Sequence, residues 1–158
     1  MIVLGIDPGT VRIGVGIIEK NGGTLTCLDV GLLSLEKKYK NDGDRLYSIE
    51  CALKKIIKKY KISLVGIETL YFSKNQKTAL AVSEARGVIL KTIAEHKIPY
   101  IEISPSGVKL AVAGDGKAKK EMVAHMVGIS LHISTNKIID DATDALAIAI
   151  ASCYTKKY

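Results

Sequence analysis

A glycine-spaced apolar stretch decides the fold of this chain: IVLGIDPGTVRIGVGIIE, residues 2 to 19. Its two halves, residues 2 to 7 and 12 to 19, are rich in β-branched side chains, and the turn-forming segment PGT lies between them. Such a pattern predicts two antiparallel strands joined by a tight turn. The first strand would end at Asp7, which places a carboxylate where an apolar run stops.

The middle of the chain alternates between strand and helix patterns. After a third strand expected over about residues 24 to 34, an amphipathic helix is expected from Asp42 to Tyr60. The run SLVGIE, which ends at Glu68, is typical of a strand that is covered on both faces. The helical pattern of residues 78 to 94 is apolar nearly all round, which predicts burial on more than one side.

The last part of the chain predicts one more strand and three helices. The strand is PYIEI, and the helices are SPSGVKLAVAG with a serine cap, KAKKEMVAHMVGI, and residues 140 to 154. A three-strand meander followed by alternating helices and strands predicts an α/β fold: a mixed five-stranded sheet with parallel strands after the meander and helices on both faces. This order is similar to that of ribonuclease H-like proteins. No linker or repeat divides the sequence, so a single domain over residues 1 to 158 is expected.

The composition limits the class of protein. Of 158 residues, 47% are hydrophobic, which is ample for a packed core. No apolar run is long enough to span a membrane and no signal peptide opens the chain, so a soluble cytoplasmic protein without membrane contact is expected. Cys27, Cys51 and Cys153 lack metal-binding spacing, which favours reduced thiols. The net charge of +7 favours a polyanionic partner, with an ordinary basic surface as the alternative.

Four acidic residues stand at the ends of apolar runs: Asp7, Glu68, Asp141 and Asp144. Carboxylates a few ångströms apart repel by about 4 kcal/mol per pair at an effective dielectric constant near 20, and bound cations reverse that sign. Carboxylate ligands without a neighbouring His or Cys favour magnesium. A pair of magnesium ions about 3.5 to 4 Å apart would suit phosphodiester hydrolysis without a covalent protein nucleophile.

Spacing alone leaves the C-terminal acidic pair ambiguous. Asp141 and Asp144 are three residues apart and Asp140 and Asp144 are four apart, so either pair would share a helix face. Asp140 or Asp141 could instead cap the start of the helix. This helix is rich in alanine, at positions 142, 145, 147, 149 and 151. Small side chains would let it approach the sheet closely enough to bring its carboxylates beside Asp7.

Basic residues accompany the acids. Four lysines lie around a glycine-rich loop and are candidates for nucleic-acid phosphate contacts, with simple solvation as the alternative: Lys109, Lys117, Lys119 and Lys120. Further candidate phosphate contacts are Arg12, Lys74, Asn75 and Arg86. Arg86 could instead have a structural role inside its apolar helix.

Two aromatic side chains, Tyr71 and Phe72, follow Glu68 in an otherwise polar segment. An aromatic ring at such a place can stack on an unpaired base. Either ring could instead fill a gap in the core, and the residues alone do not say which of the two would stack.

Four segments together resemble the RuvC Holliday-junction resolvases: GIDPGTVRIGVGII, GIETLYFSKN with ARGV after it, PSGVKLAVAGDGKAKKEMVAHMV, and DATDALAIAIA. The resemblance spans nearly the whole chain in the order and spacing of the family. It implies that four acids are the metal ligands: Asp7, Glu68, Asp141 and Asp144. Asp141 is thereby favoured over Asp140.

The resemblance also implies an activity and partners. Members of the family are homodimeric, magnesium-dependent endonucleases that nick two symmetry-related strands of a four-way DNA junction, beside the branch-migration proteins RuvA and RuvB. Manganese is expected to substitute for magnesium. Lys109 and Lys120 would lie near the scissile phosphate, and an aromatic residue matches the position of Tyr71. Two matched cuts are economically made by a two-fold dimer, and the helix at residues 78 to 94 offers an interface.

Three other functions share parts of this pattern. Actin-like sugar kinases and ATPases hold phosphate with a similar Asp, Gly and Thr turn, but they need a second lobe for which this chain is too short. YqgF-like nucleases of the ribonuclease H fold, which would act on RNA, open with a similar strand pair, but the Glu68 motif and the ending ATDALAIA are more similar to RuvC. A non-catalytic junction-binding protein would not need four carboxylates.

Overall fold

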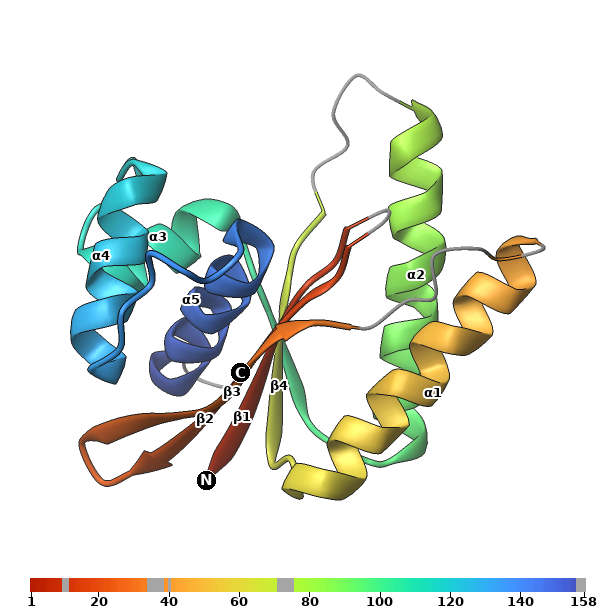
Figure 1. Ribbon diagram of the computed structural model, residues 1–158, viewed down its shortest axis with the longest axis horizontal. Coiled ribbons are helices and arrows are strands. Elements are labelled where there is room, and N and C mark those ends of the chain that lie inside the picture. Colours follow the sequence, from red (N-terminus) through yellow and green to blue (C-terminus); the bar gives the residue numbers. More distant parts are fainter. Residues whose placement is uncertain (10–11, 34–38, 40, 71–75, 156–158) are drawn as a thin grey trace.

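A mixed sheet of five strands, in the order β3-β2-β1-β4-β5, forms the centre of the part of the chain that the structure describes (Figure 1). The structure is a computed structural model, and it describes residues 1–9, 12–33, 39, 41–70 and 76–155. The strands are β1 (Ile2–Asp7), β2 (Gly14–Asn21), β3 (Thr24–Leu32), β4 (Leu64–Glu68) and β5 (Tyr100–Ile103). The helices are α1 (Asp42–Tyr60), α2 (Gln76–Glu95), α3 (Pro105–Ala113), α4 (Lys120–Leu131) and α5 (Asp140–Tyr154).

The strand pairing confirms the predicted fold class. β1 pairs antiparallel with β2, and β2 pairs antiparallel with β3, so the first three strands form a meander. β1 also pairs in parallel with β4, which pairs in parallel with β5. Figure 1 shows α1 and α2 on one face of the sheet and α3, α4 and α5 on the other, as expected for an α/β fold covered on both faces.

β2 and α4 begin two or three residues later than predicted, at Gly14 and Lys120. β2 begins at Gly14, which is paired with Asp7 at the end of β1. α4 begins at Lys120 because the residues before it form a turn around Asp115. The carbonyl and carboxylate oxygens of Asp115 accept hydrogen bonds from the backbone N–H groups of Ala118 and Lys117. The chain therefore turns once more before the helix starts.

Alternation along the central strands separates two apolar cores, one on each face of the sheet. Val3 of β1 and Leu64 of β4 are buried in the core with α3, α4 and α5. The next residue on each strand, Leu4 and Val65, is buried in the core with α1 and α2. Because side chains on a strand alternate between faces, this register also fixes the face on which the last residue of each strand lies.

Helix α5 packs directly on the strand backbones. A Cβ atom at Gly5 of β1 would overlap the carbonyl oxygen of Ala145, and one at Gly14 would overlap the carbonyl oxygen of Asp141. A Cβ atom at Gly66 of β4 would likewise meet a side chain of α5. The close approach predicted from the alanines of α5 is confirmed, and it depends equally on the glycines beneath them.

Helix α2 has one buried face and one face that carries exposed apolar surface. Ala85, Ile89 and Ile93 are fully buried against the sheet. Leu80 is 64% exposed, and Gly87, seven residues later on the same face, is also exposed. The partner expected for the outer face of this helix stays a prediction.

Two expectations from composition concern the cysteines and the membrane. Cys27, Cys51 and Cys153 are free and partly exposed, in agreement with their spacing. Within the described ranges, no helix combines the length and apolar character needed to cross a bilayer.

Candidate active site

Asp7 and Glu68 are the last residues of two adjacent parallel strands, β1 and β4. Ile6 is paired with Ile67 across these strands, so the two acids that follow lie side by side at one edge of the sheet. Ile6 and Ile67 are buried in the core with α1 and α2. Alternation therefore directs both carboxylates to the opposite face, towards α5.

Asp141 and Asp144 lie at the start of α5, over the same edge of the sheet. The side chains of both are 35% exposed, whereas that of Asp140 is 80% exposed. Gly14, which is paired with Asp7, lies against the backbone of Asp141, so the start of α5 is beside the end of β1. The N-cap of α5 is Ile139 and no side chain caps the helix, so the alternative capping role for Asp140 or Asp141 is wrong.

Burial and mutual repulsion raise the pKa values of the two strand-end acids. The pKa of Asp7 is raised from an ordinary value of 3.8 to about 6, first by burial and then by the charges of Asp144 and Asp141. The pKa of Glu68 is raised from 4.5 to about 7, again first by burial and then by the charges of Asp7 and Asp144. The carboxylates of Asp7, Glu68 and Asp144 are therefore close enough to repel one another.

The donor set of this site fits divalent magnesium. Carboxylate oxygens are the ligands that this ion prefers, and the repulsion between Asp7, Glu68 and Asp144 is of the kind that a bound cation relieves. Across the described residues, no three acidic, histidine or cysteine side chains are already gathered around one point. The four acids share one face and one edge of the sheet, but their side chains are not drawn together.

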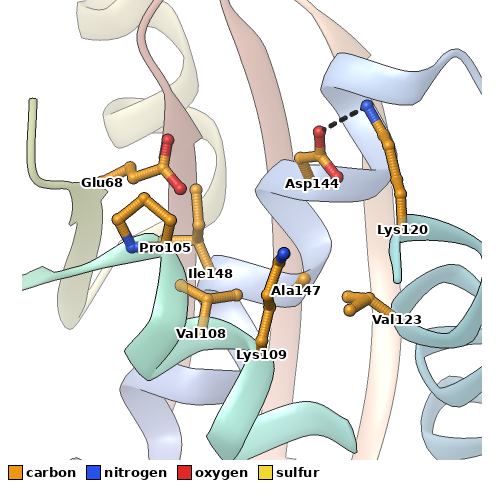
Figure 2. Close-up of a pocket in the computed structure, with 9 residues that line it drawn as sticks. All are labelled: Glu68, Pro105, Val108, Lys109, Lys120, Val123, Asp144, Ala147 and Ile148. Atoms are coloured by element: carbon orange, nitrogen blue, oxygen red, sulfur yellow. Dashed lines mark ion pairs between the residues drawn. The ribbon is translucent and has the colours of Figure 1, made fainter. Parts of the chain in front are cut away.

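A cavity of about 190 Å³ is lined by two of the acids and by two lysines (Figure 2). Glu68 and Asp144 line it together with Lys109 of α3 and Lys120 of α4. Its apolar wall consists of Pro105, Val108, Val123, Ala147 and Ile148. The positive charges of Lys109 and Lys120 oppose the rise in the pKa of Glu68. The cavity thus brings an acidic edge and a basic edge together beside an apolar wall.

Lys120 forms ion pairs with two carboxylates of α5. Its Nζ lies 2.9 Å from Oδ2 of Asp144 and 3.5 Å from Oδ2 of Asp140 (the first pair is dashed in Figure 2). Burial alone would lower the pKa of Lys120, but the hydrogen bond and charge of Asp144, with a smaller contribution from Asp140, raise it above its ordinary value. Lys120 is therefore charged and held at the acidic site.

Three of the other predicted phosphate contacts are exposed, and one of them lies beside an acid of the site. Nη1 of Arg12 is 4.0 Å from Oδ2 of Asp141, and the Arg12 side chain is 64% exposed. Lys117 and Lys119 are exposed in the segment between α3 and α4. All three are exposed, and none of them lines the cavity beside Glu68 and Asp144.

Arg86 does not reach the acids. Its Nη2 lies 2.6 Å from Oε2 of Glu102 on β5, and its side chain is only 19% exposed. This geometry favours the structural role that the sequence left open for Arg86. Four further candidates lie outside the described residues: Tyr71, Phe72, Lys74 and Asn75.

Sequence reasoning missed two features of the site. Asp140 was considered only as a metal ligand or a helix cap, but it forms an ion pair with Lys120. The signal was present in its four-residue spacing from Asp144, which puts both carboxylates within reach of one ammonium group. The contact of Gly14 with the backbone of Asp141 was also missed, since a strand glycine does not reveal what lies above it.

The sheet order, the helices on both faces and the acidic edge together define a ribonuclease H-like nuclease. A family model described as crossover junction endodeoxyribonuclease RuvC matches residues 3–152. The chain therefore belongs to the RuvC family, and the assignment made from its motifs is confirmed.

Similar proteins match along nearly the whole chain. A crossover junction endodeoxyribonuclease RuvC of Chloroflexus aggregans is 43% identical over 155 residues, which are 98% of this chain and 94% of that protein. A relative of the same name from Prochlorococcus marinus strain MIT 9211 is 39% identical and covers 99% of this chain and 98% of its own. The alternative of a YqgF-like nuclease acting on RNA is not favoured by these matches.

Solved structures agree with the fold. The structure of T. thermophilus RuvC in complex with a Holliday junction substrate superposes with a TM-score of 0.89 at 28% identity, over 98% of this chain and 93% of that one. The yeast mitochondrial Holliday junction resolvase Ydc2 has a TM-score of 0.65 at 16% identity, over 94% of this chain and 77% of that one. The second likeness shows a shared fold.

Proposed function

We propose that this protein is an endodeoxyribonuclease that resolves four-way (Holliday) DNA junctions in recombination and repair. One observation carries the proposal: the carboxylates of Asp7, Glu68 and Asp144 interact electrostatically beside Lys109 and Lys120. Family membership supports it, because relatives that match the whole chain bear the name crossover junction endodeoxyribonuclease. The reaction is paired hydrolysis of phosphodiester bonds on two symmetry-related strands.

Four acids would hold the divalent ions: Asp7, Glu68, Asp141 and Asp144. We propose two magnesium ions, with manganese as a substitute. When bound, such ions activate water and stabilise the charge on the phosphate and the departing oxygen. The raised pKa values of Asp7 and Glu68 support this role, since a site that repels its own charges gains most from a cation.

The basic residues would hold and position the DNA. Lys109 and Lys120 line the cavity beside Glu68 and Asp144, where an ammonium group can neutralise a phosphate oxygen at the reacting bond. The exposed residues Arg12, Lys117 and Lys119 would contact the flanking phosphates. Such contacts set the register of the DNA on the protein and make binding weaker as salt increases.

A dimer would make the two cuts. We propose that the outer face of α2, which includes Leu80 and Gly87, pairs with the same face of a second copy, because apolar surface around an exposed glycine allows close helix contact. The same proposal includes a single nuclease domain over residues 1 to 158, a cytoplasmic location, and cooperation with RuvA and RuvB.

Cleavage of a synthetic four-way junction tests the activity. In magnesium, the natural chain is expected to nick two opposed strands and release ligatable duplexes. Asp7→Asn and Asp144→Asn should each lower the cleavage rate by about 100-fold or more while junction binding in EDTA persists. Glu19→Gln is the matched control, because Glu19 is exposed at the far end of β1 and β2, opposite Ile2. A junction left uncut by the natural chain would contradict the proposal.

A further inference from the structure

Lys120 occupies an unfavourable place for a lysine. It is the first residue of α4, where the aligned peptide dipoles leave partial positive charge, and the side chain of its neighbour Lys119 at the N-cap makes no capping hydrogen bond. The helix dipole therefore opposes a cation at this position. Two carboxylates from another helix, Asp144 and Asp140, compensate for that cost. The backbone of Lys120 is part of α4, but its ammonium group is stabilised by the carboxylates of α5.

The two partners of Lys120 differ in what else they can do. The side chain of Asp144 is 35% exposed, and its charge raises the pKa values of Asp7 and Glu68, so Asp144 is part of the acidic site. Asp140 is 80% exposed and lies one helical turn away, on the rim of a neighbouring cavity of about 460 Å³ that Lys120 also lines. The shorter contact of Lys120 is thus to a proposed metal ligand, and the longer one is to an acid outside the ligand set.

We propose that Lys120 is a resident counter-cation of the acidic site, which a divalent ion displaces from Asp144, and that Asp140 is the positioning residue that retains the displaced ammonium group. This inference rests on the proposed metal-dependent function. An ammonium group and a divalent ion cannot both lie against one carboxylate oxygen without strong repulsion. With Asp140 only 3.5 Å away, Lys120 can release Asp144 and still remain beside the cavity.

The arrangement has two consequences. Before metal loading, the charge of Lys120 offsets part of the repulsion among the acids, as its opposing effects on Asp7 and Glu68 indicate. After loading, the released ammonium group faces the cavity where the phosphate would lie. Metal binding would therefore also place the cation that contacts DNA, and Asp140 would keep it from swinging into solvent.

Metal affinity without DNA tests the displacement. Mn²⁺ binding is measured by electron paramagnetic resonance of the free ion, with circular dichroism to verify folding. Lys120→Met should bind the first Mn²⁺ about three- to ten-fold more tightly than the natural chain, which is the range expected when a partly exposed ion pair no longer competes. Lys119→Met is the matched control: it removes the same charge from the adjacent exposed position and should change the affinity less than about two-fold.

A double-mutant cycle tests Asp140. Asp140→Asn should weaken Mn²⁺ binding by about two- to five-fold, because the displaced ammonium group has lost its second acceptor. In the Lys120→Met background the same change should have little effect, since Asp140 acts through Lys120. An equal effect in both backgrounds would mean that Asp140 acts directly on the metal, and would overturn its positioning role.

The ammonium group can also be observed directly. In protein labelled with ¹⁵N-lysine, the Lys120 Nζ signal, identified by its loss in Lys120→Met, should shift when Mg²⁺ is added. Equal Mn²⁺ affinities for Lys120→Met and Lys119→Met, or a Lys120 signal that Mg²⁺ leaves unchanged, would overturn the displacement. Failure of the natural chain to bind Mn²⁺ at all would instead overturn the proposed metal-dependent function.

Discussion

Gly14 of β2 lies directly against the carbonyl oxygen of Asp141 at the start of α5, so closely that a methyl group at position 14 would overlap it. Gly14 is also the residue paired with Asp7 at the end of β1. One backbone position therefore sets the separation between a strand-end acid and the helix that carries two others. The geometry of the proposed active site therefore depends on a residue that has no side chain.

We expect Gly14→Ala to move the start of α5 away from the sheet. An overlap with backbone atoms cannot be relieved by rotating a side chain, so the unfolding free energy should fall by about 1 to 3 kcal/mol. A displacement of about 1 Å at the acids should lower junction cleavage by about 100-fold. Gly31→Ala is the control, because a Cβ atom there meets nothing within 4 Å. Equal cleavage by the two variants would show that Gly14 does not position the acids.

The raised pKa values predict how metal-free stability depends on pH. Between about pH 4 and pH 7 the folded chain holds protons on Asp7 and Glu68 that the unfolded chain releases, so the unfolding free energy falls as pH rises through this range. Asp7→Asn should remove part of this dependence and stabilise the protein at pH 8 in EDTA by about 1 to 3 kcal/mol. Urea unfolding at pH 5 and pH 8 measures it, with Glu19→Gln as the control. If Asp7→Asn were no more stable than the natural chain at pH 8, the repulsion among the acids would not destabilise the folded protein, and this prediction would be wrong.

Substitution of Arg86 and of Arg12 should have different effects, because the first arginine has a structural role and the second is expected to contact DNA. Arg86 is mostly buried and paired with Glu102, so Arg86→Met leaves a carboxylate without its partner and should lower the unfolding free energy by about 1 to 3 kcal/mol. Arg12 is largely exposed, so Arg12→Met should leave stability nearly unchanged and weaken junction binding. Thermal unfolding and mobility-shift titrations measure both. The reverse pattern would assign Arg86 to DNA contact.

The exposed face of α2 should control the oligomeric state. Leu80→Asp and Gly87→Arg each place charge on this face, and both should shift the protein towards monomers. Paired nicking should fall more than single nicking, because each site would then act alone. Ile129→Asp is the control, since Ile129 of α4 is a comparably exposed apolar residue on the other face of the sheet. Sedimentation velocity at micromolar protein measures the change, and an unaltered sedimentation coefficient for both α2 variants would exclude this interface.

The sequence predicted the strands, the helices and the positions of the strand-end acids because these depend on local periodicity. The end of an apolar run at Asp7 and Glu68 marks the edge of the sheet. Because side chains alternate between the two faces along a strand, the position of each acid in its strand decides which face it occupies. The position of α4 relative to α5 is a matter of tertiary packing. The pairing of Lys120 with Asp140 therefore had no local signal beyond the spacing of the two aspartates.

Arg86 is a second residue whose partner could not be predicted from local sequence patterns. Its place in an apolar helix allowed either a phosphate contact or a buried ion pair, and only the position of β5 relative to α2 favours the second. Arg86 and Lys120 each pair with the element that directly follows their own helix, but the way in which two consecutive elements face each other is decided by tertiary packing, which local periodicity does not contain.

The most direct test of the account is to locate divalent ions in the protein itself. In a crystal grown with Mn²⁺, anomalous scattering should reveal metal within about 2 Å of carboxylate oxygens of Asp7, Glu68 and Asp144. The same crystal of Asp7→Asn should lose at least one of these peaks. Manganese bound elsewhere, with these three carboxylates left without a metal ion at saturating concentration, would contradict the claim that they form one metal site.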